Sequence, residues 1–186
     1  MITIVKADGT AEQQQIMAMR QRAAETGAGI EKSAREIMEA VRTQGFPAVR
    51  DYSLQFDHVE PYEIPQKALK AAAKRIDPEL LRALEQSAEN IWAYQSQLLT
   101  RSKEWESPMQ GGMVGQIVRG LRRVGVYVPG GRAAYPSSVL MNVVPAKVAG
   151  CGEIIMVTPP TENLNDAVLA AAWVAKVDRV IAVGGV

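Results

Sequence analysis

Apolar residues recur at three- and four-residue steps through the first part of the chain, a spacing that predicts helices. Residues 10–26 form a polar pattern with few apolar positions, whereas residues 30–44 have a clear apolar face and stop at Gly45. Pro47 fits the first turn of a further short helix, which we expect to end at residues 57–58. The chain thus begins with a series of separate helices.

Two more helices are predicted before residue 100. Pro65 can begin the first, and Asp77 followed by Pro78 is typical of an N-cap and the first position of the second. This second helix is the longest and is expected to run to Leu99. Its apolar stripe is typical of a packing surface, and we expect Trp92 and Tyr94 on this helix to be packing groups rather than part of a cofactor site. The first hundred residues are therefore expected to form a helical layer.

The period of the pattern changes after residue 102. Residues 103–118 hold a Gln-Gly-Gly turn between two short stretches, which predicts a β-hairpin. From residue 124 onward, strand and helix patterns alternate, as in a parallel sheet with right-handed crossovers. The expected elements are a strand at 124–128, a helix at 137–149, a strand at 153–157, a helix at 164–176 and a strand at 179–183.

This order of elements defines the expected fold class. It is α/β, with an N-terminal helical layer and a hairpin, followed by an incomplete Rossmann-like parallel β-α-β-α-β unit. We expect two domains, a helical region with the hairpin at residues 1–122 and the Rossmann-like half-domain at residues 123–186.

The composition excludes several classes of protein. The chain has 21 Lys and Arg against 20 Asp and Glu, a net charge of +1, and the charges are interspersed, so nothing indicates nucleic-acid binding. No apolar run reaches the roughly 18 residues of a membrane span. The first residues lack the basic region and the long apolar core of a secretion signal. We expect a soluble, cytoplasmic protein with no membrane or nucleic-acid partner.

The chain contains one cysteine and one histidine. Cys151 cannot form a disulfide within the chain, and its position at the entrance to an apolar strand favours a small buried residue over a reactive thiol. His58 lies in a short turn, where a solvated surface role is favoured over catalysis. Because a catalytic zinc ion usually takes several nitrogen or carboxylate ligands, we expect no self-contained zinc site.

The glycine turn that follows the strand at 124–128 is the first candidate for ligand binding. In open parallel sheets, ligands bind beyond the carboxyl ends of the strands. Gly130 and Gly131 would let backbone amides approach a phosphate, and Arg132 would add a charge-assisted bond. Ser137 or Ser138 can cap the following helix, whose positive end favours an anion. A plain tight turn with a solvated arginine explains the same residues, since neither a dinucleotide fingerprint nor a Walker loop is present.

Two further side chains lie near this turn. Tyr127 is near the carboxyl end of its strand, where its ring would stack on a nucleotide, although a core tyrosine would give the same pattern. Lys147, on the following helix, is expected to extend to solvent.

Several motifs, in this order and spacing, closely resemble those of the histidinol dehydrogenases. They are VGVYVPGG at 124–131, YPSSVLM at 135–141, PAKVAG at 145–150, TPP at 158–160 and VGG at 183–185. The VRTQG stretch at 41–45, with Tyr52, FD at 56–57 and AENI at 88–91, also matches the N-terminal half of that family. The resemblance covers essentially the whole chain.

The resemblance implies an enzyme that uses zinc and two NAD to oxidise L-histidinol through histidinal to L-histidine, as a homodimer. Of the family's cofactor-contacting residues, Tyr127 is the one present, and Gly130 and Gly131 adjoin it. The family's Glu-His acid-base pair and its zinc ligands have no counterparts, so no catalytic or metal-binding residue is expected in this chain. The family usually has aspartate and proline where this chain has Phe46 and Gly120, both away from the expected chemistry.

The resemblance therefore implies an N-terminal, truncated portion that is inactive alone. A non-catalytic nucleotide-binding or dimerisation module, or a dehydrogenase of the same family acting on another amino or sulfonated alcohol, remains an alternative. Because parallel sheets are normally covered on both faces, an incomplete one should expose apolar surface. We expect an open edge at strand 179–183 and self-association through this region.

Overall fold

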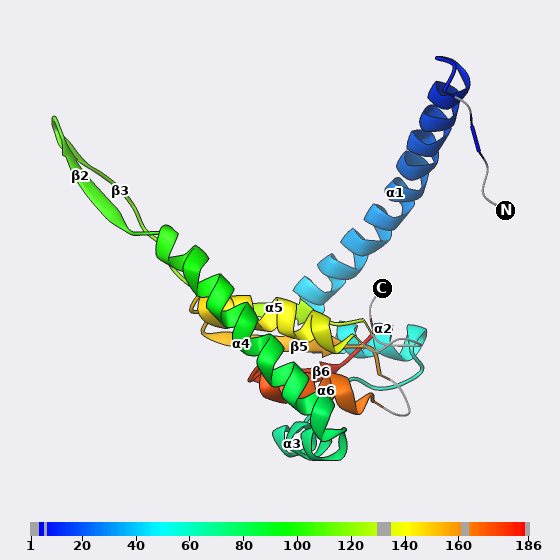
Figure 1. The fold of residues 1–186 in the computed structure, drawn as a ribbon. Helices are drawn as coiled ribbons and strands as arrows, with labels where there is room; N and C mark the ends of the chain where they lie inside the picture. Colours follow the sequence, from blue (N-terminus) through cyan, green and yellow to red (C-terminus); the bar gives the residue numbers. More distant parts are fainter. Residues whose placement is uncertain (1–3, 6, 130–134, 161–163, 185–186) are drawn as a thin grey trace. The chain divides into compact units, whose positions relative to one another are not determined.

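A computed structural model describes residues 4–5, 7–129, 135–160 and 164–184, and for residues 22–28 the backbone alone. Helices and strands alternate along the second half of the chain (Figure 1). The helices are α1 (Ala11–Gln44), α2 (Phe46–Phe56), α3 (Gln66–Arg75), α4 (Pro78–Arg101), α5 (Pro136–Val148) and α6 (Asp166–Val174). The strands are β1 (Tyr62–Ile64), β2 (Trp105–Met109), β3 (Gly112–Gln116), β4 (Arg123–Tyr127), β5 (Glu153–Thr158) and β6 (Arg179–Ala182).

The contacts divide the chain into two compact units, residues 1–51 and residues 52–185. The first unit consists mainly of α1, a single helix of 34 residues. The prediction of two separate helices at 10–26 and 30–44 is thus wrong. Gly27 and Gly29 each cost about 1 kcal/mol in a helix, but no proline interrupts the stretch, so the helix continues through them.

The predicted helix ends are largely confirmed. The N–H of Gly45 donates to the carbonyl of Val41, and Gly45 has the positive φ that glycine adopts easily, so α1 ends there. Asp77 caps α4, since its carboxylate accepts the N–H of Glu79 at 2.6 Å, and Pro78 is the first helical residue. The hairpin is also confirmed, with β2 and β3 joined at Gln110 and Gly111.

One mixed sheet organises the second unit. Its strand order is β1-β6-β5-β4; β4, β5 and β6 run parallel, and β1 pairs antiparallel with β6. The predicted parallel β-α-β-α-β unit is confirmed. The predicted open edge at strand 179–183 is wrong, because β1 covers the outer side of β6. With only three residues between Pro61 and Pro65, β1 is too short to show an alternating pattern in the sequence.

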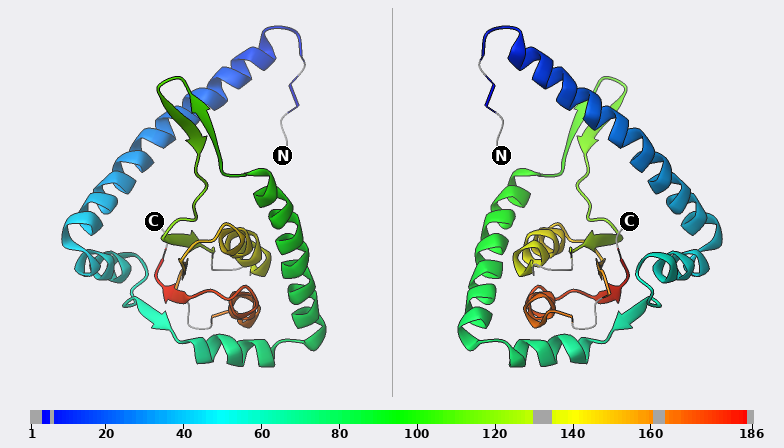
Figure 2. Two further views of the ribbon diagram at one scale, coloured as in Figure 1. Left: turned by 90° about the vertical axis from the view of Figure 1, so that its left-hand side faces the viewer. Right: turned by 90° about the vertical axis from the view of Figure 1, so that its right-hand side faces the viewer.

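The helices of the second unit cover one face of this sheet. Figure 2 shows α5 and α6 beside the sheet, with α4 outside them, and α3 packs mainly on α6. The main core lies between the strands and these helices. Its largest fully buried side chains are Leu69, Val128, Val139, Leu140, Val143, Ile154, Met156 and Val180.

The two-domain boundary after residue 122 stays a prediction. By contacts, α3, α4 and the sheet lie together in the second unit. In the part of the chain that the structure describes, no helix has the length and apolar character needed to cross a membrane.

Candidate functional site

Tyr127 is the last residue of β4, at the carboxyl edge of the parallel strands. Its neighbour Val128 is fully buried and donates its N–H to the carbonyl of Val157, which fixes the end of the strand. Tyr127 therefore points to the face away from the helices, and 50% of its surface is exposed. It is not a core tyrosine, so its ring is free to contact a ligand.

The other two residues predicted to contact a cofactor, Gly130 and Gly131, lie outside the described residues, as does Arg132. Their role in a phosphate-binding turn stays a prediction.

Helix α5 begins just after this turn, and its N-terminus differs from the prediction. Tyr135 is the N-cap and Pro136 is the first helical residue, and among the described residues no side chain makes a capping hydrogen bond to this end of the helix. The prediction that Ser137 or Ser138 is the cap is thus wrong, because both lie within the first turn; the N–H of Ser138 donates to the carbonyl of Tyr135. An uncapped helix N-terminus at the carboxyl edge of the sheet favours an anion.

Asp57, which follows α2, binds the backbone just after the end of β6. One of its carboxylate oxygens accepts the N–H of Gly184 at 3.0 Å. A Cβ atom at position 184 would lie 2.1 Å from this carboxylate, so the contact requires glycine. The turn that carries Asp57 is itself fixed, since the hydroxyl of Ser53 donates to the carbonyl of Val59 and His58 has a left-handed backbone. The sequence carries no sign of this contact, because the two residues lie 127 positions apart.

Asp178 joins elements at the opposite, amino edge of the sheet. Its carboxylate accepts the N–H of Ile154 at 2.7 Å and the ammonium of Lys147 at 2.8 and 3.0 Å. Burial acts to raise the pKa of Asp178, but these bonds outweigh it and hold the pKa below its usual value. The expectation that Lys147 extends to solvent holds in part, because its side chain is partly exposed but its ammonium is paired with Asp178.

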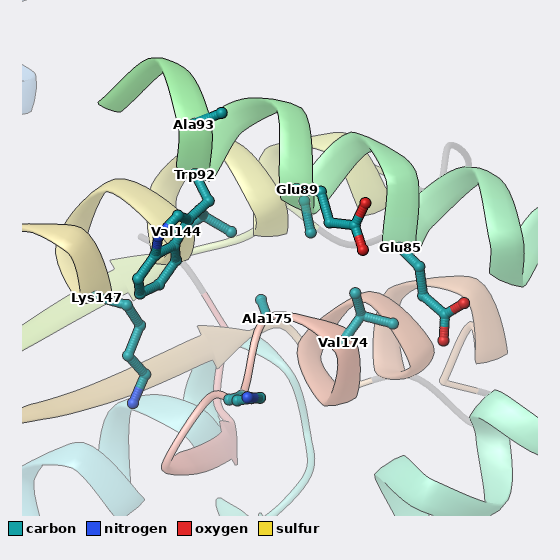
Figure 3. A pocket seen from close by; sticks show the side chains of 10 residues that line it. Glu85, Glu89, Trp92, Ala93, Val144, Lys147, Val174 and Ala175 are labelled. Carbon is teal, nitrogen blue, oxygen red and sulfur yellow. The ribbon is translucent and has the colours of Figure 1, made fainter. Parts of the chain in front are cut away.

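A groove of about 650 Å³ lies on the same side as Asp178 (Figure 3). It runs between α4, α5 and the end of α6, with Val144, Val174 and Ala175 among its apolar lining and Trp92 half exposed beside them. Because residues 174–176 precede β6, the groove is at the end of the sheet opposite Tyr127. It is separate from the predicted nucleotide site.

Within the described ranges, no three His, Cys, Asp or Glu side chains gather where they could hold a metal ion. These residues therefore do not fit the zinc site that the resemblance implies. Cys151 is a partly buried free thiol packed against the core, broadly as predicted.

The parallel strands and the crossover helices define an α/β protein with a Rossmann-like sheet. The family model described as histidinol dehydrogenase matches residues 20–186. The chain belongs to the histidinol dehydrogenase family.

Individual relatives agree with this assignment. The histidinol dehydrogenase of Streptococcus mutans is 49% identical over 158 residues, and that of Burkholderia lata is 42% identical over 198 residues, or 99% of this chain. The crystal structure of histidinol dehydrogenase from Elizabethkingia anophelis is similar, with a TM-score of 0.71 and 26% identity over 84% of this chain. The match to the S. mutans protein spans 37% of its length, and that to B. lata 44%, so the chain corresponds to a portion of these enzymes.

Proposed function

We propose that this chain is an N-terminal portion of a histidinol dehydrogenase, which in its whole form oxidises L-histidinol to L-histidine with NAD in histidine biosynthesis. The family match over residues 20–186 carries this proposal. We also propose that the whole enzyme is a cytoplasmic homodimer. NAD, when bound, supplies the hydride acceptor for both oxidation steps.

The contribution of this chain is one wall of the NAD site. Tyr127 would stack on the nucleotide, because its ring is half exposed at the carboxyl edge of β4. Gly130 and Gly131 would leave room for the backbone to approach the phosphates, and the N-terminus of α5 would favour their charge. The described residues do not fit a zinc site. We infer that the chain alone is inactive.

Replacing Tyr127 with alanine should weaken NAD binding by the chain. Stacking of a base on an aromatic ring is worth about 1–3 kcal/mol, so we expect a rise in Kd of roughly 5- to 150-fold in a calorimetric titration. Tyr94→Ala is the matched control, since Tyr94 is an exposed tyrosine on α4, and it should leave the Kd unchanged. Equal affinity of Tyr127→Ala and the unaltered chain would show that Tyr127 does not contact the nucleotide.

A second candidate function is a non-catalytic nucleotide-binding module. The exposed ring of Tyr127 and the N-terminus of α5 favour it, because both belong to this chain and neither needs a residue from the rest of the enzyme to contact a nucleotide. Tight NAD binding by the chain alone would support the module, whereas weak binding would support a portion that depends on the rest of the enzyme. A third alternative is that the whole enzyme oxidises another amino or sulfonated alcohol. Assaying the whole enzyme with L-histidinol and with each of these alcohols distinguishes the two substrates.

A further inference from the structure

Two sequence motifs that lie far apart in the chain meet at the carboxyl edge of the sheet. The FD motif at 56–57 spans the end of α2, and the VGG motif at 183–185 follows β6. A carboxylate oxygen of Asp57 accepts the N–H of Gly184 at 3.0 Å. This contact therefore fixes the backbone two residues beyond Ala182, the last residue of β6.

The register of the strands places Gly184 relative to Tyr127. Tyr127 pairs with Val157 on β5. The next residue of β5, Thr158, pairs with Ala182 on β6. Because β5 lies between β4 and β6, the ends of these two strands are about 10 Å apart. A dinucleotide that binds beyond the carboxyl ends of the strands would therefore approach both Tyr127 and the segment that holds Gly184.

The turn that carries Asp57 is ordered by bonds of its own. The N–H of Asp57 donates to the carbonyl of Ser53. The hydroxyl of Ser53, which is buried, donates to the carbonyl of Val59. His58 has a left-handed backbone, which turns the chain sharply after α2. Because these bonds do not involve β6, the turn presents a preformed acceptor to the segment that follows β6.

Space, rather than backbone conformation, requires glycine at position 184. The φ of Gly184 lies outside the left-handed region. A Cβ atom there would lie 2.1 and 2.4 Å from the two carboxylate oxygens of Asp57. Both oxygens thus lie against the Cα of Gly184, and the absence of a side chain lets the carboxylate reach the backbone.

We propose that Asp57 is a positioning residue for the nucleotide site, because it holds the segment after β6 where this segment binds NAD together with Tyr127. The inference rests on the proposed NAD-binding function of the carboxyl edge. Asp57 acts through the backbone of Gly184 rather than by touching the nucleotide. A segment that is already ordered loses less conformational entropy when a ligand binds, so the contact raises the affinity for NAD.

The test measures NAD affinity and thermal stability in the same variants of the chain. Asp57→Ala removes the acceptor, whereas Asp57→Asn keeps an oxygen that accepts the N–H of Gly184. Because one hydrogen bond makes a modest contribution, we expect Asp57→Ala to raise the Kd for NAD roughly three- to tenfold in a calorimetric titration. Asp57→Asn should raise the Kd by less than about twofold.

Asp178→Ala is the matched control. Asp178 also accepts a backbone N–H, that of Ile154 at 2.7 Å, but it does so at the amino edge of the sheet. This variant should lower the thermal midpoint of the chain and leave the Kd for NAD unchanged. The comparison separates a loss of stability from a loss of position.

Gly184→Ala tests the same contact from its other side. Its Cβ would displace the carboxylate of Asp57, so we expect a Kd close to that of Asp57→Ala. In the Asp57→Ala background the carboxylate is absent, so adding Gly184→Ala should change the Kd by less than about twofold.

The Tyr127→Ala variant separates this inference from the proposed NAD site. If Tyr127→Ala weakened NAD binding and Asp57→Ala did not, the positioning role would be overturned and the NAD site would stand. If neither variant changed the Kd, or the unaltered chain did not bind NAD, the proposed site and this inference would fail together. If Asp178→Ala raised the Kd as much as Asp57→Ala, stability alone would explain the effect, and the positioning role would again be overturned.

Discussion

Replacing Leu140 with alanine should lower the free energy of unfolding by about 3 kcal/mol. Leu140 lies on α5 and is 1% exposed, among the largest fully buried side chains of the core. The loss combines the transfer free energy of the removed atoms with the cavity left between elements that pack closely. Thermal unfolding followed by circular dichroism should show the midpoint falling by roughly 6–12 °C.

Met141 provides the control for this prediction. It is the next residue on α5, but 57% of its surface is exposed. Met141→Ala should change the free energy of unfolding by no more than about 0.5 kcal/mol. If the two substitutions had equal effects, α5 would not pack on the sheet through the face that contains Leu140.

Replacing Asp178 with alanine is expected to have the second-largest effect on stability, about 2 kcal/mol at pH 7. The change leaves the N–H of Ile154 without its acceptor, next to a fully buried side chain, and leaves Lys147 without its carboxylate. The ion pair with Lys147 contributes the smaller share, because both side chains are partly exposed and solvent screens their attraction. Urea unfolding of the two proteins measures the difference.

The pH dependence of this difference has a defined sign. The pKa of Asp178 is lowered in the folded chain, so the folded state favours the ionised form more than the unfolded state does. The stabilisation is fully present above the unfolded pKa of about 3.9 and is lost as the pH falls through the lower folded pKa. The difference in stability between the unaltered protein and Asp178→Ala should therefore shrink below pH 4. A constant difference down to acid pH would show that the charge of Asp178 is not involved.

Much of the fold follows from local signals in the sequence. Asp77 and Pro78 start α4 as predicted because a cap and a fixed φ act within one turn. The alternation of strands and helices after residue 122 predicts the parallel strands, because each of these elements also has a local pattern of its own in the sequence. By contrast, the glycines at 27 and 29 do not end α1, since glycine weakens a helix without blocking its hydrogen bonds.

The elements that sequence reasoning missed depend on partners far along the chain. Strand β1 forms because Tyr62–Ile64 pairs with β6, some 120 residues later. Asp57 likewise meets Gly184, and Lys147 meets Asp178, only after the sheet has assembled. Of the candidate site, the sequence correctly placed Tyr127 at the end of its strand, but its exposure depends on the burial of its neighbours.

Turnover of L-histidinol tests most directly whether this chain supplies one wall of an active site that is completed elsewhere in the enzyme. The purified 186-residue chain is assayed with L-histidinol, NAD and zinc beside the full-length S. mutans enzyme, and NADH formation is followed. General acid-base groups alone are typically worth about 10² to 10⁴ in rate, so turnover should be lower by at least that factor. Turnover by the chain alone at a rate comparable with that of the full-length enzyme would contradict the proposed role.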